Sequence, residues 1–334
     1  MQTSIEIDRH PNIVWELTRA CALQCRTCPV DAQPLRSDRE LSTYDSYCAV
    51  DQIADLQPSR FVITGGDPLR RDDLFALLRH ARERSLDPIV ELSPTSMLTR
   101  GAVDALRDCG VRRVAFALDD VDPRRHDARR GIAGQYLATV TAMGWAVGTG
   151  LEFEINTLVD RRNLHHLGAL LTLAEKLGAA AWNLFILVPA GASKEVELIT
   201  ALELEQLFAF VDGAASSPVR VRLHEAPQYR RRHLENLSLD GTSTIFITHL
   251  GDVQPGSFIP VPAGNLRRRA LEWIYEKGEI FRALRDDTRL TGKCGRCPFR
   301  CICGGSRARA LAMTGDLFAS DPLCAYDPDA VPFH

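Results

Sequence analysis

Residues 15–29 read WELTRACALQCRTCP, and within them Cys21, Cys25 and Cys28 follow a short apolar segment with the spacing C-x3-C-x2-C. A [4Fe–4S] cluster normally takes four cysteine thiolates, so a compact loop with three of them leaves one iron without a protein ligand. A structural zinc site would need a fourth Cys or His close by, and the next thiol or imidazole is Cys48, twenty residues on. The spacing therefore predicts a cluster with an open coordination position.

The composition of the chain indicates the cellular compartment in which such a cluster would be found. The chain has 334 residues, a net charge of −3 and ten cysteines, about 3% of the sequence, which is far below the density of small secreted scaffolds. The first residues, MQTSIEIDRHPNIVWEL, lack the pattern of a signal peptide, and no apolar run approaches the length of a membrane span. We therefore expect a soluble, cytoplasmic protein with reduced thiols and no membrane partner. The balanced charge argues against a nucleic-acid partner.

A glycine-rich segment follows at 61–68, where the apolar run FVIT leads into Gly65, Gly66 and Asp67. Glycine has no Cβ, so the backbone here can approach a ligand closely. Alone, Gly-Gly-Asp is an ordinary turn. After a C-x3-C-x2-C loop, however, it resembles the radical S-adenosylmethionine (radical SAM) superfamily. The resemblance implies that SAM chelates the open iron, that the GGD segment receives the SAM amine, and that the reduced cluster cleaves SAM to a 5′-deoxyadenosyl radical.

Short apolar segments alternate with amphipathic ones along the first half of the chain. The expected strands are 13–17, 60–64, 88–93, 113–118, 150–158 and 181–188, and the expected helices are 43–56, 71–85, 100–109, 134–144 and 164–177. This alternation predicts an α/β fold with a parallel sheet. The resemblance implies a partial (β/α)6 TIM-like barrel in 1–215, a bridging region in 216–250 and a small auxiliary domain in 251–334.

The same resemblance implies further contacts with SAM near the carboxyl ends of later strands, where such barrels build their sites. They fall at Ser93 and Thr95 after the third strand, at Asn156 within the fifth, and at Leu187 and Val188 after the sixth.

The segment 117–131 resembles the family pattern SLDG…HDxxRG. Ala117 and Asp120 stand where relatives often have serine and glycine. Asp119 and Asp127, which match the aspartates of this pattern, are equally consistent with a capped turn. Arg130 is the expected contact for a carboxylate of SAM or of the substrate.

A second cysteine group lies near the C-terminus. Its spacing is C-x2-C-x5-C-x20-C, formed by Cys294, Cys297, Cys303 and Cys324. Four thiols can ligate a metal centre completely, and C-x2-C pairs serve zinc as well as iron. The segment resembles the SPASM or twitch extension of radical SAM enzymes, which implies a second, auxiliary [4Fe–4S] cluster. Cys301 could replace Cys303 as a ligand, and Ser306 stands where many relatives have another cysteine, so we expect one auxiliary cluster.

A local basic cluster at 228–233 lies between the predicted barrel and the auxiliary domain, with Arg222, His224 and Glu225 just before it. Such a cluster is usually a solvated surface. Its position would also suit a carboxylate-rich substrate.

Across nearly its whole length the chain resembles the radical SAM group that includes enzymes of alternative haem synthesis and of haem d1 maturation. The resemblance implies oxidation, including decarboxylation, of a carboxylate-bearing substrate such as a tetrapyrrole, with a flavodoxin- or ferredoxin-type electron donor. Two alternatives stay open. One is modification of a ribosomal peptide or of a small natural product such as a nucleoside or sugar. The other is a non-catalytic Fe–S or zinc scaffold.

Overall fold

A curved sheet with the strand order β10-β9-β8-β1-β2-β3-β4-β5-β6-β7 organises the computed structural model, which describes residues 8–23, 25, 28, 31–189, 197–233 and 243–330. The strands are β1 Asn12–Thr18, β2 Arg60–Gly65, β3 Pro88–Leu92, β4 Arg113–Ala117, β5 Glu152–Val159, β6 Ala181–Ile186, β7 Arg220–His224, β8 Thr244–Ile247, β9 Asp252–Gln254 and β10 Gly264–Asn265. Neighbouring strands from β8 through β1 to β7 pair in parallel. The β9 and β10 strands pair antiparallel at one edge.

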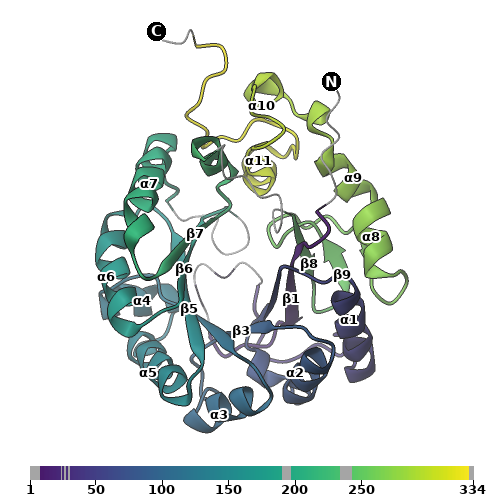
Figure 1. Ribbon diagram of the computed structural model, residues 1–334, viewed down its shortest axis with the longest axis vertical. Coiled ribbons are helices and arrows are strands. Elements are labelled where there is room, and N and C mark those ends of the chain that lie inside the picture. The colour runs from purple at the N-terminus through teal and green to yellow at the C-terminus, as the bar shows by residue number, and fades with distance from the viewer. Residues whose placement is uncertain are drawn as a thin grey trace.

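Helices surround the convex side of this sheet, except α10 and α11, which lie at the gap between its two ends (Figure 1). The helices are α1 Thr43–Asp55, α2 Leu74–Glu83, α3 Arg100–Asp108, α4 Pro123–Arg130, α5 Gln135–Thr149, α6 Leu167–Leu177, α7 Ala201–Gly213, α8 Leu271–Lys277, α9 Glu279–Arg285, α10 Gly292–Arg296 and α11 Arg307–Thr314. Short 3-10 helices lie at Pro68–Arg70, Leu164–His166, Ala214–Ser216, Pro227–Arg232 and Asp287–Arg289. Reciprocal capping boxes begin α1 and α7, formed by Ser42 with Asp45 and by Thr200 with Glu203.

The predicted α/β fold with a parallel sheet is confirmed, and all six predicted strands are present within a few residues of their expected ends. The sheet also gains the parallel strands β7 and β8, which the sequence analysis did not identify. The predicted end of the helix at 134–144 was wrong. The helix runs through Gly144 to Thr149, and it is capped by Gly150, which adopts the left-handed conformation that terminates helices.

Alternate residues of each strand face opposite sides of the sheet. Ile13 and Trp15 of β1 belong to the main core between sheet and helices, whereas Val14 belongs to a small inner cluster with Val62 and Ile89. The inner side also carries buried polar residues, including Glu16, Glu154 and Asn183. The concave side is therefore partly polar, unlike the apolar layer beneath the helices.

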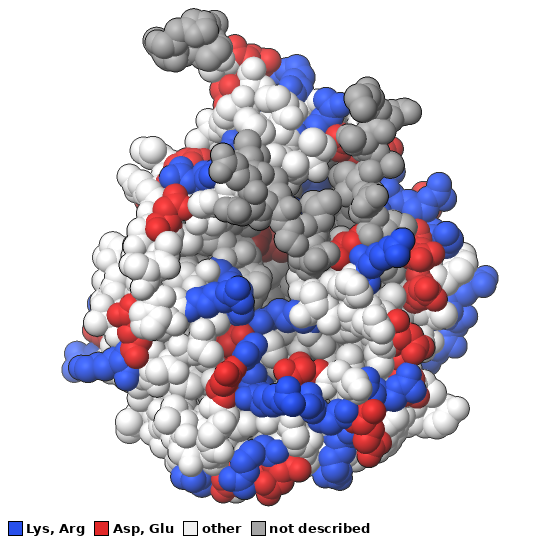
Figure 2. Space-filling model, viewed as in Figure 1, with Lys and Arg blue, Asp and Glu red and all other residues white. Residues whose placement is uncertain are grey.

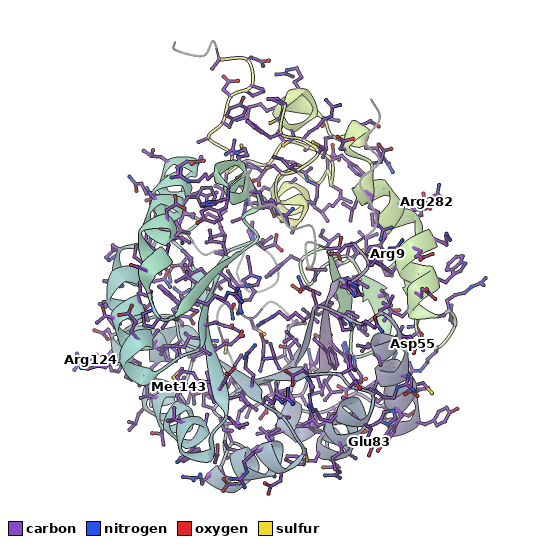
Figure 3. All side chains as sticks on the ribbon, viewed as in Figure 1. Arg9, Asp55, Glu83, Arg124, Met143 and Arg282 are labelled. Atoms are coloured by element: carbon purple, nitrogen blue, oxygen red, sulfur yellow. The ribbon has the colours of Figure 1, made fainter. Side chains whose placement is uncertain are left out.

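Charged side chains cover the outside of the ring. Figure 3 places Asp55, Glu83, Arg124 and Arg282 on the outer helices, and all four are exposed. On the face shown in Figure 2, basic and acidic side chains are interleaved. No helix in the described part of the chain is long and apolar enough to cross a membrane.

The C-terminal quarter lies between the two ends of the curved sheet. Figure 1 shows α10 and α11 beside the gap that separates β7 from β8 and β9. The Ser306 hydroxyl donates to Glu225 at 2.7 Å, and Arg309 donates to the Glu225 carbonyl at 3.0 Å. The strands β7 and β8 both fall within the predicted bridging region 216–250, so the sheet continues through it. The division into domains stays a prediction.

Candidate active site

A pocket toward the carboxyl ends of β2 to β5 brings together the N-terminal cysteines and the glycine turn. Its empty volume, counted out to open solvent, is about 880 Å³. The predicted site residues that line it are Cys21, Cys25, Cys28, Gly65, Gly66, Ser93, Arg130 and Asn156. Ala117 lines it as well.

The cysteine loop is held by backbone bonds at its first cysteine. The Cys21 amide donates to the Gln33 carbonyl at 2.7 Å, and the Cys21 sulfur accepts from the Leu23 amide at 3.3 Å. Burial raises the pKa of Cys21 and of Cys25. Binding of iron must therefore displace the thiol protons, as metal binding to cysteine generally does. Three thiols around one pocket fit the three-cysteine cluster that the sequence predicts.

The two glycines allow β2 to end directly against the loop that leads to Cys21. A Cβ on Gly65, whose φ is +146°, would lie 2.3 Å from the Thr18 carbonyl oxygen, and a Cβ on Gly66 would lie 2.5 Å from that of Ala20. The Gly66 amide donates to the Thr18 carbonyl at 2.8 Å. A side chain at either position would thus push away the segment that carries the cysteines.

Asp67 stabilises this turn through hydrogen bonds of its buried carboxylate. Its carboxylate is fully buried and accepts from the Thr95 hydroxyl at 2.6 Å and from the Leu69 amide at 3.2 Å. Burial raises the pKa of Asp67, and the two hydrogen bonds act in the opposite direction. Ser93 donates to the Gly66 carbonyl at 2.9 Å. Asp67 and Thr95 do not line the pocket, so their predicted contact with SAM stays a prediction.

Arg130, at the end of α4, joins the cysteine loop to the segment that follows β4. Its guanidinium forms an ion pair with the buried Asp119 and lies 4.0 Å from the Cys25 sulfur. Burial alone would raise the pKa of Asp119, but Arg130 and then Arg129 lower it. Asp120 lies apart from the pocket and pairs with Arg125 at 2.8 Å. Arg130 is therefore the cation nearest the predicted cluster ligands among the residues that line this pocket.

Glu91 also lines the pocket, and the sequence analysis did not identify it. It accepts from the Thr64 hydroxyl and from the Asn156 amide, the latter at 2.7 Å. Asn156 in turn accepts from Asn183 at 2.8 Å. Burial raises the pKa of Glu91. The sequence feature that could have identified Glu91 is its position as the single charged residue in the otherwise apolar strand PIVEL.

The hydrogen bonds from Glu91 through Asn156 to Asn183 continue to a charged cluster inside the barrel. Asn183 donates to Glu154 at 2.8 Å, and Glu154 also pairs with Arg60 and with Arg222, the latter at 3.1 Å. Burial opposes ionisation of Glu154, but these partners lower its pKa to about 2. Arg222, which the sequence placed beside a surface basic cluster, thus has an interior partner.

Leu187 and Val188 lie outside the pocket. Both are buried, and Val188 packs with Ile259, Ala308 and Leu317 in a small core beneath the C-terminal region. Their predicted contact with SAM therefore stays a prediction that the pocket does not support.

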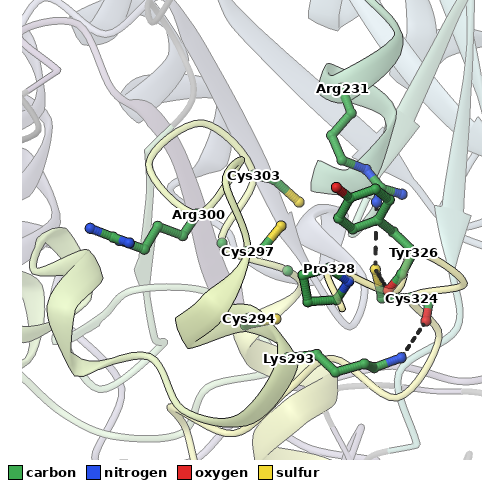
Figure 4. Close-up of a pocket in the computed structure, with 11 residues that line it drawn as sticks. Arg231, Lys293, Cys294, Cys297, Arg300, Cys303, Cys324, Tyr326 and Pro328 are labelled. Atoms are coloured by element: carbon green, nitrogen blue, oxygen red, sulfur yellow. Dashed lines mark hydrogen bonds between the residues drawn. The ribbon is translucent and has the colours of Figure 1, made fainter. Parts of the chain in front are cut away.

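A second pocket, with an empty volume of about 330 Å³, brings together the four C-terminal cysteines Cys294, Cys297, Cys303 and Cys324 (Figure 4). Cys301 is exposed and is not among the residues that line it. Burial raises the pKa of Cys303 to about 11. Among the described residues, no group of three or more His, Cys, Asp or Glu side chains is placed to hold a single metal ion.

The basic cluster at 228–233 contacts this second pocket. Arg231 lies 3.8 Å from the Cys324 sulfur, pairs with Glu205 at 3.2 Å and lies over the Tyr326 ring. Arg230 donates to the Ile302 carbonyl at 3.4 Å. The cluster therefore joins the barrel to the C-terminal region, and it is not simply a solvated surface.

Known proteins resemble this chain in sequence and in fold. Residues 15–174 match the sequence model described as "Radical SAM superfamily". The chain is 34% identical to the "AdoMet-dependent heme synthase" of Nitratidesulfovibrio vulgaris, covering 95% of this chain and 92% of that protein. It is 25% identical to the "PqqA peptide cyclase" of Methylocella silvestris, covering 98% and 91% of the two chains.

The fold is similar to that of Streptococcus suis SuiB bound to S-adenosylmethionine, with a TM-score of 0.78, 15% identity, and coverage of 95% of this chain and 78% of that one. The predicted family resemblance and the prediction of an enzyme are confirmed, which disfavours the non-catalytic scaffold. By its whole-length similarity to a relative at 34% identity, the chain belongs to the radical SAM superfamily, whose enzymes use a [4Fe–4S] cluster and SAM.

Proposed function

We propose that this enzyme oxidatively decarboxylates a carboxylate-bearing tetrapyrrole, converting propionate side chains to vinyl groups. The observation that carries the proposal is the 34% identity, over 95% of this chain, to a protein named AdoMet-dependent heme synthase. In this reaction the propionate loses a hydrogen atom, an electron and carbon dioxide, and a carbon–carbon double bond forms. The hydrogen goes to the SAM-derived radical, and the electron needs an acceptor.

Cys21, Cys25 and Cys28 are the residues that we assign to the cluster, and the Gly65-Gly66 backbone is the surface that we assign to SAM. When bound, these cofactors supply a 5′-deoxyadenosyl radical that abstracts hydrogen from an unactivated carbon. The glycine turn lies directly against the segment leading to Cys21, and this proximity supports a SAM site beside the cluster.

Arg130 is the residue that we assign to a carboxylate of SAM or of the substrate. Its guanidinium lines the pocket, and Asp119 holds it from the buried side. The Asn156 amide lines the same pocket, and its hydrogen bonds to Glu91 and Asn183 fix which way it points. These residues orient the bound molecules, and the buried carboxylate of Asp119 keeps Arg130 in place.

We assign the four C-terminal cysteines to an auxiliary [4Fe–4S] cluster that accepts the electron released with carbon dioxide. The support is their convergence on one pocket and the exclusion of Cys301 from it. The spacing also leaves zinc open, because C-x2-C pairs serve both metals, but no group of three such side chains among the described residues is placed to hold a single ion. A flavodoxin- or ferredoxin-type protein would reduce the N-terminal cluster.

Modification of a peptide is the second candidate function. It is favoured by the 25% identity to a protein named PqqA peptide cyclase over 98% of this chain. The same two cofactor sites would serve either substrate, because the SAM-derived radical is common to both reactions. Only the substrate distinguishes the two proposals.

The test begins with anaerobic reconstitution of the whole protein and of a Cys21→Ala/Cys25→Ala/Cys28→Ala variant. We expect about eight iron atoms per chain in the wild type and about four in the variant. With SAM and dithionite, only the wild type should form 5′-deoxyadenosine. About four irons in the wild type would instead assign the C-terminal cysteines to zinc or to structure.

Substrates are then compared by mass spectrometry. With coprohaem we expect products that have each lost carbon dioxide and two hydrogen atoms per propionate. If no porphyrin loses carbon dioxide while a peptide substrate is turned over, the tetrapyrrole assignment is wrong and the second candidate replaces it.

A further inference from the structure

Arg307, the first residue of α11, places a cation beside the second cysteine pocket. Its Nη2 lies 3.8 Å from the Cys294 sulfur. Its other nitrogens donate to backbone carbonyls, with Nη1 at 2.8 Å from that of Leu317 and at 2.7 Å from that of Ala319. These carbonyl bonds hold the guanidinium plane so that one N–H group is directed at the sulfur.

The preceding turn is shaped around this contact. Gly305 has a φ of +71°, and a Cβ there would lie 2.8 Å from the Arg307 guanidinium and 3.3 Å from the Cys294 sulfur. Any other residue would thus occupy the space through which Arg307 reaches Cys294. Glycine has no Cβ to clash with these two side chains, and it adopts the left-handed conformation without strain.

Among the described residues, Arg307 forms no ion pair with a carboxylate, and its hydrogen bonds go to backbone carbonyls and to a sulfur. The nearby Asp321 is already bound on both oxygens by Arg309, at 2.8 and 2.7 Å. Arg231, the other arginine directed at a cysteine sulfur here, shares its charge with Glu205 (Figure 4 shows its contact with Cys324).

Arg307 is half-buried, and the Cys294 sulfur lies in contact with its guanidinium. A partly buried guanidinium without a carboxylate partner is costly unless an anion lies beside it. Cys294 is the group in contact that can supply that negative charge, as a thiolate bound to a metal centre. Hydrogen bonds and cations near cluster sulfurs stabilise the more negative, reduced form and so raise the reduction potential.

We propose that Arg307 is the counter-ion of an iron–sulfur centre at Cys294, Cys297, Cys303 and Cys324, and that its N–H···S contact with Cys294 raises the reduction potential of that centre. This inference rests on the proposed auxiliary cluster. It makes Arg307 a positioning residue of the electron acceptor, acting through Cys294, rather than a residue that touches substrate.

The test uses the full-length chain carrying Cys21→Ala/Cys25→Ala/Cys28→Ala, so that only the C-terminal centre contributes to the spectrum. Arg307→Gln and Arg307→Lys are introduced into it, and Arg296→Gln is the matched control. Arg296 lies between Cys294 and Cys297 in sequence, but it is exposed and pairs with Asp329 at 2.6 Å. Iron and sulfide content, circular dichroism and the midpoint potential are measured for each protein under anaerobic conditions.

We expect Arg307→Gln to shift the midpoint potential to a more negative value, Arg307→Lys to shift it less, and Arg296→Gln to leave it unchanged. A potential in Arg307→Gln equal to that of the control, with full iron content, overturns the inference alone. If Arg307→Gln loses its iron, recovery of iron in Arg307→Lys supports the counter-ion role and loss in both overturns it. A parent protein that holds zinc without iron or sulfide overturns the auxiliary cluster and this inference together.

Discussion

At the scale of single residues, a substitution of Asp67 can show whether this carboxylate stabilises the fold or contacts SAM. Replacing it with alanine leaves the Thr95 hydroxyl and the Leu69 amide without their buried acceptor. We expect Asp67→Ala to lower the free energy of unfolding by about 1–3 kcal/mol, as measured by urea denaturation. Asp67→Asn keeps an acceptor oxygen and should lose less. A variant that unfolds like the wild type but binds SAM weakly would instead assign Asp67 to direct ligand contact.

Glu154 makes stability depend on pH in a predictable direction. Its pKa in the folded protein is about 2, lowered from an ordinary value of 4.5. A carboxyl whose pKa is lowered by folding stabilises the protein above pH 4.5 and loses that contribution as pH falls toward 2. Between pH 6 and pH 4 the loss is on the order of 1 kcal/mol.

The measurement is urea denaturation of wild type and Glu154→Gln at both pH values. We expect the variant to be less stable at pH 6, because Arg60 and Arg222 lose their partner, and to show a smaller drop at pH 4. An equal drop in both proteins would mean that other carboxyls carry the acid sensitivity.

Sequence spacing could identify site residues that lie together in one short motif. It could not identify residues whose role depends on contacts with other strands. The three cysteines and two glycines lie within short motifs, and they do line one pocket. Asp67 belongs to the same motif, yet it does not line the pocket and its carboxylate accepts from Thr95. Glu91 is bound by residues from two other strands, which lie distant in sequence.

At the scale of elements, the junction between β1 and β2 depends on the glycine turn. Gly66→Ala would place a Cβ 2.5 Å from the Ala20 carbonyl, so the backbone before Cys21 must move. We expect a loss of about 1–3 kcal/mol in unfolding free energy, as for overpacked sites, together with loss of the N-terminal cluster iron. Gly144→Ala is the control, because a Cβ there meets nothing within 4 Å.

The control should be neutral or slightly stabilising, since Gly144 lies within α5 and alanine favours helix by up to about 1 kcal/mol. If Gly66→Ala binds iron and SAM as the wild type does, the close approach of the two segments is not required.

Apolar periodicity identified six of the eight parallel strands and missed β7 and β8, for a physical reason. The sequence of β7, RVRLH, carries Arg220, Arg222 and His224, so it reads as part of a basic cluster. Those charges are accommodated because Glu154 meets Arg222 inside the barrel. The strand β8, TIFI, has only four residues and is defined by pairing with β1, more than two hundred positions earlier.

At the scale of the whole molecule, one buried ion pair ties the C-terminal quarter to the barrel. Arg309 and Asp321 are both fully buried and bonded to each other at 2.7 Å. Asp321 also accepts from the Ser306 amide at 2.7 Å and from the Gln228 side chain, which follows β7. Arg309 reaches the Glu225 carbonyl. The pair thus connects the segment after β7 with both halves of the second cysteine group.

Removing one charge of this pair should loosen the C-terminal quarter before the barrel. In Asp321→Asn the buried Arg309 loses its partner, which costs about 3–5 kcal/mol. Hydrogen exchange should then quicken in residues 292–330 and around β7, whereas β2 to β5 keep their protection because their core lies under other helices. Asp329→Asn removes an exposed carboxylate from the same region and should change exchange little, since such pairs contribute at most about 1 kcal/mol. Equal acceleration throughout the sheet would show that the two parts unfold as one unit, so that the ion pair stabilises the whole barrel and not only the region that closes its gap.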